Sequence, residues 1–155
     1  NKIPLFIAID QEGGRVNRMP KDFKNLPPAN KLAKCKNEEI IEEAAQITGE
    51  MLNKSGFNFD FAPVLDIKRF DDSHAIGDRA FSEDKEIVAK YGIKYMKKLQ
   101  ENSVLPVIKH FPGHGATSQD AHFILPVIKK LQNEDTYPFE KAIKISMFNV
   151  KKIYY

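Results

Sequence analysis

The chain has 155 residues, of which 42% are hydrophobic and 29% are charged, a composition typical of a globular protein with a buried core. Its formal net charge is only +3, and the lysines are scattered in ones and twos. Surfaces that bind nucleic acid concentrate positive charge, so we expect no nucleic-acid partner. The longest apolar run, near residues 3–9, is too short to span a bilayer, so we expect no membrane partner.

Cys35 is the only cysteine, which excludes an intrachain disulfide and fits a reducing compartment. We therefore expect a cytoplasmic protein. The sequence begins at Asn1 rather than Met and enters a strand-like run at once. We therefore expect that further residues preceded it.

Three apolar runs predict β-strands, at residues 3–9, 57–65 and 104–108. Their nearly continuous apolar character is typical of parallel strands that are covered on both faces. Helical patterns lie between and after them, at residues 40–52, 87–99 and 139–147. We expect Gly56 to end the first helix, Ser82 to cap the second, and Pro138 to lie in the first turn of the third.

This alternation predicts an α/β fold with right-handed crossovers, either a doubly wound sheet or part of a barrel. Polar residues follow each predicted strand, among them Asp10, Asp66 and Lys109. Active sites of (β/α)₈ barrels are built at the carboxyl ends of the strands, whereas a doubly wound sheet brings such residues together only near a switch point. Three polar strand ends in succession favour the barrel.

Several isolated residues have both a functional and a structural interpretation. Asp10 and Asp66 either cap the turns that follow their strands or bind hydroxyl groups of a ligand. Arg79 lies in the long 68–82 loop, where it is either a solvated ion-pair partner or a donor to a sugar or a carboxylate. Asp60 lies inside a strand-like run, so we expect a structural role.

The richest segment of the chain is a cluster of histidines after the third predicted strand. Three of the four histidines, His110, His114 and His122, lie within residues 110–122, beside Lys109 and Asp120. In one interpretation the three histidines and Asp120 bind a divalent metal. In the other, Asp120 and His122 form a dyad in which the carboxylate supports proton transfer by the imidazole. The spacing alone leaves both open.

Four short runs of the sequence closely resemble a known family. The runs that carry the resemblance are IDQEGGRV at 9–16, FAPVLD at 61–66, IGDR at 76–79, and KHFPGHG at 109–115 followed by Asp120 and His122. They resemble glycoside hydrolase family 3, and within it the bacterial β-N-acetylhexosaminidases of cell-wall recycling (the NagZ type). The resemblance extends over residues 3 to about 145, in the family's order.

The resemblance implies a TIM (β/α)₈ barrel and a retaining glycosidase with a covalent glycosyl-enzyme intermediate. It implies that His122 is the general acid/base with Asp120 as its partner. It also implies a sugar-binding role for a second group of residues, which is Asp10, Arg79, Lys109 and His110. The implied partner is a carbohydrate that contains N-acetylglucosamine, such as a muropeptide or a chitobiose-like sugar. No cofactor or metal is implied.

The sequence departs from the family in one respect. The family's nucleophile is an aspartate in a Ser-Asp-Asp-like segment near a later strand, and no such segment occurs here. A complete barrel needs about 250 residues, so we expect residues 1–155 to be part of one barrel domain, with roughly three to four βα units. An open part-barrel exposes strand edges and apolar surface, so we expect self-association and doubtful activity of the chain alone. A non-catalytic remnant that only binds sugar is therefore a further alternative to the glycosidase and to the metal-dependent hydrolase.

Overall fold

The computed structural model describes residues 5–69, 75–117, 127 and 131–150, with side chains up to residue 145 in the last helix. Three short parallel strands form one sheet in the order β1 (Ala8–Ile9), β2 (Phe59–Asp60) and β3 (Leu105–Pro106). The register pairs Ala8 with Phe59 and Phe59 with Leu105. The predicted parallel order is confirmed, but regular pairing covers only two residues of each predicted strand.

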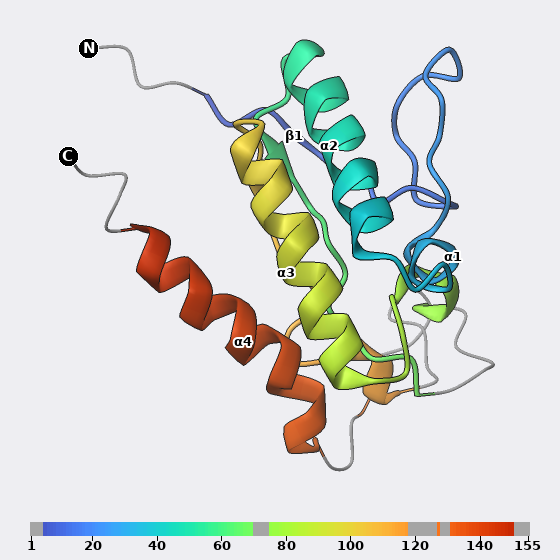
Figure 1. Ribbon diagram of the computed structural model, residues 1–155, viewed down its shortest axis with the longest axis vertical. Helices are drawn as coiled ribbons and strands as arrows, with labels where there is room; N and C mark the ends of the chain where they lie inside the picture. The colour runs from blue at the N-terminus through green and yellow to red at the C-terminus, as the bar shows by residue number, and fades with distance from the viewer. Residues whose placement is uncertain (1–4, 70–74, 118–126, 128–130, 151–155) are drawn as a thin grey trace.

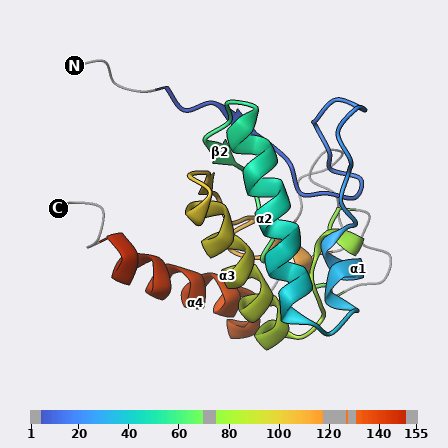
Figure 2. The same ribbon diagram turned by 45° about the horizontal axis from the view of Figure 1, so that its top comes forward.

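Helices lie along the sheet, as Figures 1 and 2 show. They are α1 (Ala29–Ala33), α2 (Glu38–Lys54), α3 (Lys85–Glu101) and α4 (Asn133–Val150). Helix α3 packs between α2 and α4. Two 3₁₀ turns, η1 (Gly77–Arg79) and η2 (His114–Ala116), lie in the loops that follow β2 and β3. Each strand is therefore followed by a loop and then a helix, which confirms the predicted βα rhythm.

The ends of the two central helices follow local side-chain chemistry. Asn37 caps α2, and Gly56 follows its last turn with φ +86°, as predicted. The cap predicted for α3 was wrong by two residues. Asp84, not Ser82, accepts the hydrogen bond from the backbone N–H of Glu86, at 2.7 Å. Ser82 instead accepts from the N–H of Asp84, at 3.1 Å, and so fixes the cap itself.

Helix α4 begins earlier than its apolar pattern predicts. It starts at Asn133, so Pro138 lies inside the helix rather than in its first turn. The acidic residues Glu134 and Asp135 occupy the first turn, where they interact favourably with the helix dipole. Polar residues thus start this helix, and hydrophobic periodicity alone does not detect them.

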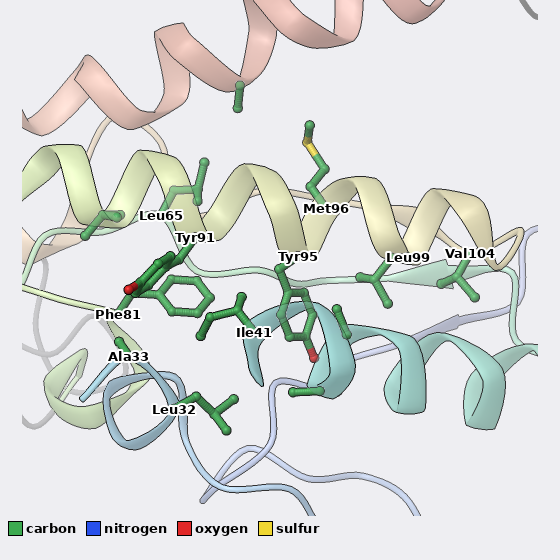
Figure 3. Close-up of a cluster of buried hydrophobic side chains, with 14 of the residues drawn as sticks. Leu32, Ala33, Ile41, Leu65, Phe81, Tyr91, Tyr95, Met96, Leu99 and Val104 are labelled. Atoms are coloured by element: carbon green, nitrogen blue, oxygen red, sulfur yellow. The ribbon is translucent and has the colours of Figure 1, made fainter. Parts of the chain in front are cut away.

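The core lies between the sheet and the helices, includes Phe139 and Ala142 of α4, and is shown in part in Figure 3. Tyr95 extends from α3 toward α2, where its hydroxyl donates to Thr48 Oγ1 at 3.0 Å. Phe81 packs edge-on against Tyr91, with ring centroids 6.2 Å apart. The Cα of Gly92 faces Leu65 so closely that a Cβ there would lie 2.1 Å from Leu65 Cδ2. Close packing of this kind fixes α3 against the segment that leads into the site.

The opposite face of the sheet carries uncovered apolar side chains. Ala8, Phe59 and Leu105 share one register row and point to this face, whereas Ile9 in the next row is buried in the core. Phe6 and Leu105 are 75% and 44% exposed. In a (β/α)₈ barrel this face is the interior, which side chains from the other strands fill.

Among the residues that the structure describes, no helix combines the length and the apolar character that crossing a bilayer requires.

Candidate active site

Polar residues from all three βα units meet beyond the carboxyl ends of the strands. Asp10 directly follows β1, and Lys109 lies three residues after β3. Val64 and Lys109 form a parallel bridge, in which the Leu65 N–H donates to the Lys109 carbonyl at 2.7 Å. This bridge extends the pairing of the second and third units and carries Asp66 to the same end of the sheet.

Lys109 joins the first and third units by two ion pairs. Its Nζ lies 2.5 Å from Asp10 Oδ1 and 2.5 Å from Glu12 Oε1. The Lys109 side chain is largely buried, whereas the Asp10 side chain is 37% exposed. Asp10 therefore presents acceptor oxygens to the solvent side of the cluster, and Lys109 holds its carboxylate in place.

Glu12 also forms a bidentate ion pair with Arg79. Arg79 Nε donates to Glu12 Oε2 at 2.8 Å, and the terminal Nη2 donates to Oε1 at 2.7 Å. Burial by itself would raise the pKa of Glu12, but the hydrogen bonds from Arg79 and Lys109 outweigh it and hold the pKa below its ordinary value. Burial would likewise lower the pKa of Arg79, and its pairing with Glu12 keeps that pKa raised. Both groups are charged and are fixed by each other.

His110 lies between Arg79 and Asp66. Its Nε2 is 3.1 Å from Arg79 Nη2, and its Nδ1 is 2.6 Å from Asp66 Oδ2. Asp66 is fully buried and accepts three further hydrogen bonds, all from backbone N–H groups. The donors are His110 at 3.1 Å, His114 at 2.6 Å and Gly115 at 3.4 Å. One carboxylate therefore organises the whole turn that carries the first two histidines.

The same turn depends on glycines for its close packing. A Cβ on Gly115 would lie 1.9 Å from the carbonyl oxygen of Ile67, so only glycine fits there. Gly113 has φ +135°, a conformation that other residues rarely adopt. The peptide bonds Lys109–His110 and Phe111–Pro112 are cis. The glycines of this motif thus let the chain pass directly over the segment that holds Asp66.

Asp60 lies behind this cluster, on β2. Its Oδ1 accepts from the Gln11 N–H at 3.0 Å, whereas its buried Oδ2 has no partner among the described residues. Burial raises the pKa of Asp60 to about 7. This carboxyl group supports the backbone that leads into Glu12, in agreement with the expected structural role.

The structure brings together Asp10, Arg79, Lys109 and His110, the four residues predicted to bind sugar. Asp120 and His122, the predicted acid/base pair, lie outside the described residues. Two further residues, Glu12 and Asp66, belong to the cluster. The sequence leaves Asp66 open between a turn-capping and a ligand-binding role, and its three backbone hydrogen bonds show that it caps a turn. Glu12 was not predicted. Both occur in motifs that the sequence displays, but nothing in their spacing indicates that Glu12 would bind two cations from other units.

The described residues do not form the metal site that the histidine cluster could suggest. Among residues 5–69, 75–117, 127 and 131–150, no group of three or more potential ligands is arranged to hold a metal ion. Both ring nitrogens of His110 already have protein partners. Nδ1 of His114 is buried and makes no hydrogen bond within the described residues.

The sequence profile described as "Glycosyl hydrolase family 3 N terminal domain" matches residues 1–151. The chain belongs to glycosyl hydrolase family 3. The beta-hexosaminidase LpqI of Mycobacterium tuberculosis is 36% identical over 145 residues, which is 91% of this chain and 37% of LpqI. Other curated relatives are also named beta-hexosaminidase, and the chain spans under half of their length as well.

Solved structures of this family share the fold. The family 3 β-N-acetylglucosaminidase from Paenibacillus sp. is 36% identical with a TM-score of 0.87, covering 92% of this chain and 28% of that one. NagZ from Neisseria gonorrhoeae is 30% identical with a TM-score of 0.81, covering 91% and 44%. These matches confirm the predicted TIM-barrel-like α/β fold and the resemblance to NagZ. One further relative, CbsA from Thermotoga neapolitana (31% identity, TM-score 0.80, covering 88% and 30%), has been solved with zinc bound.

Proposed function

We propose that this chain supplies the sugar-binding wall and the acid/base pair of a retaining β-N-acetylglucosaminidase that acts in peptidoglycan recycling in the cytoplasm. The observation that carries the proposal is the convergence of Asp10, Lys109, Arg79 and His110 from three βα units on one side of the sheet. The names of the relatives, beta-hexosaminidase and β-N-acetylglucosaminidase, support the choice of sugar.

The hydrogen-bond inventory of the cluster fits a polyhydroxylated ligand. The Lys109 ammonium has three N–H groups, and its two carboxylate partners leave one for a ligand. The Arg79 guanidinium has five, of which Glu12, His110 and the Ala75 carbonyl engage four. Asp10, with its exposed carboxylate, accepts from hydroxyl groups. Fixed donors and an acceptor of this kind hold a sugar ring in a reactive geometry.

In the proposed reaction, an enzyme carboxylate from another part of the barrel attacks the anomeric carbon as the glycosidic bond breaks. His122 gives its proton to the departing oxygen, and Asp120 stabilises the imidazolium beforehand. His122 then takes a proton from the water that attacks the glycosyl-enzyme bond, and the sugar and the carboxylate are released. The retaining outcome and the Asp120–His122 roles come from the family resemblance.

The test compares hydrolysis of the p-nitrophenyl glycosides of N-acetyl-β-glucosamine and of β-glucose. Because the chain spans under half the length of its relatives, the assay uses both the 155-residue chain and any longer product of the same gene. We expect the longer product to hydrolyse the N-acetylglucosaminide and to release the same sugar from muropeptides. Preference for the glucoside, or no hydrolysis of either glycoside by the longer product, would contradict the proposal.

A metal-dependent hydrolase built on His110, His114, Asp120 and His122 is the alternative, and the zinc-bound relative makes it worth testing. Dialysis against a chelator separates the two. We expect activity to survive chelation, because the proposed chemistry uses carboxylate and imidazole groups alone. Loss of activity that added zinc restores would instead favour the metal-dependent reaction.

A further inference from the structure

The hydrogen bonds around His110 define which of its ring nitrogens carries the proton. A guanidinium group has only donors, so Nε2 must accept from Arg79 Nη2, 3.1 Å away. Nδ1 then carries the proton and donates to Asp66 Oδ2 at 2.6 Å. We propose that Asp66 is a positioning residue, which locks His110 as the neutral Nδ1–H tautomer so that its Nε2 holds Arg79 in the orientation needed to bind the sugar.

Asp66 is suited to this role because it is surrounded by donors. Its Oδ2 accepts from the backbone N–H and the ring of His110, and its Oδ1 accepts from the N–H groups of His114 and Gly115. An ionised carboxylate is the only common side chain that offers acceptors at both atoms. An asparagine would present an NH₂ group to two donors at one of these positions. The site is therefore built for the charged form of Asp66.

The orientation of Arg79 is sensitive to His110, because the other hydrogen-bond partners of its guanidinium among the described residues are acceptors in fixed places. Glu12 receives Nε and Nη2, and the Ala75 carbonyl receives Nη1 at 2.6 Å. If Nε2 of His110 carried a proton, an N–H would face the guanidinium at 3.1 Å. The tautomer therefore decides whether Arg79 stays in the cluster or turns away from it.

In this arrangement His110 orients Arg79, whereas the family resemblance implies that His110 binds the sugar itself. Both of its ring nitrogens are occupied by Asp66 and Arg79, so the ring acts on the ligand mainly through Arg79. A metal ion at Nε2 would first have to displace the guanidinium. The link from Asp66 to sugar binding rests on the proposed function, whereas the tautomer itself does not.

The direct test is a long-range ¹H–¹⁵N correlation spectrum of the chain labelled with ¹⁵N-histidine, with His110 assigned from the His110→Gln variant. We expect the unmodified chain to show a protonated Nδ1 and an unprotonated Nε2 at His110. A protonated Nε2, or nitrogen shifts averaged between the two tautomers, would overturn the proposal. This measurement needs no substrate, so it stands apart from the failure or success of the glycosidase assay.

Two variants extend the test to function. In the active, longer product, Asp66→Asn should raise KM for the N-acetylglucosaminide by roughly ten- to a hundredfold, with a smaller effect on kcat, since a charge-assisted hydrogen bond is lost. Asp22→Asn, at an exposed carboxylate, is the matched control and should leave KM unchanged. An unchanged KM in a folded Asp66→Asn protein would contradict the positioning role.

If Asp66→Asn does not fold, Arg79→Gln provides the second arm. Its shorter side chain should leave Nδ1 protonated while the Nε2 resonance of His110 moves, because the donor to Nε2 has gone. An Nε2 resonance that does not move would show that Arg79 makes no hydrogen bond to His110, and the proposal would fail.

Discussion

Glu12 lies between Arg79 and Lys109 and accepts hydrogen bonds from both side chains with one nearly buried carboxylate. The two cations come from different βα units, so Glu12 holds the second and third units of the site to the first. Without it, two positive charges would share a partly desolvated space, where Asp10 contacts Lys109 but no other carboxylate of the described residues contacts Arg79.

We therefore expect Glu12→Gln to weaken both the fold and the site. The free energy of unfolding should fall by roughly 3 kcal/mol, because removal of one partner leaves buried charges uncompensated. In the active protein, kcat/KM should fall at least tenfold. Glu43→Gln, an exposed glutamate on α2, is the matched control for urea unfolding and for kinetics. Equal unfolding midpoints for the two variants would refute the bridging role.

The sequence predicts the site residues better than it predicts their partners. Asp10 and Lys109 each follow an apolar strand, and this local pattern predicts that both lie at the same end of a parallel sheet, whereas their sugar-binding role is implied by the family resemblance. The sequence does not predict the role of Glu12, because that role depends on Arg79, 67 residues away, and no periodicity encodes the contact. The shift of the α3 cap from Ser82 to Asp84 has a similar cause, since either side chain can cap a helix and tertiary packing decides where the first turn begins.

Asp60 predicts a measurable pH dependence of stability. Burial raises its folded pKa to about 7, above the value of an exposed aspartate, so the folded state retains a proton that the unfolded state loses. The protonated Asp60 carboxyl group favours the folded state. Its contribution to the free energy of unfolding is complete below the unfolded pKa, near 4, and is lost as pH rises toward 7. Between these limits the loss is roughly 1.4 kcal/mol per pH unit.

Asp60→Asn should remove this dependence while it keeps an acceptor for the Gln11 N–H. Urea unfolding of the unmodified chain and of the variant at pH 5 and pH 8 gives the comparison. We expect the variant to gain stability relative to the unmodified chain at pH 8. A difference between the two proteins that is the same at both pH values would mean that Asp60 does not titrate in this range.

Alanine substitutions at Gly115 and Gly56 test whether the turn that carries His110 and His114 packs directly against the backbone of Ile67. Gly115→Ala would drive a Cβ into the Ile67 carbonyl, which belongs to the backbone and cannot move aside. Gly56→Ala meets nothing within 4 Å and bears only the cost of its positive φ, about 1 kcal/mol. Thermal unfolding should therefore show a much larger loss for Gly115→Ala. Similar losses would mean that the turn does not lie against Ile67.

His122 carries the prediction that comes from the family resemblance alone. In the active protein, His122→Ala should slow hydrolysis strongly for substrates with poor leaving groups, by about 10²–10⁴-fold, because protonation of the departing oxygen is lost. An aryl glycoside with a good leaving group needs little protonation and should be affected much less. Equal losses on both substrates, measured as kcat, would argue against an acid role for His122.

The uncovered face of the sheet predicts self-association of the 155-residue chain. Phe6 and Leu105 expose large apolar surfaces on the face opposite the helices, and burial of such surface between molecules is favourable. We expect oligomers at micromolar concentration in sedimentation velocity experiments. The double variant Phe6→Ser/Leu105→Ser should shift the distribution toward monomer, whereas Ile87→Ser, an exposed isoleucine on α3, should not. Monomeric behaviour of the unmodified chain would mean that this face is covered in solution by some other part of the same molecule.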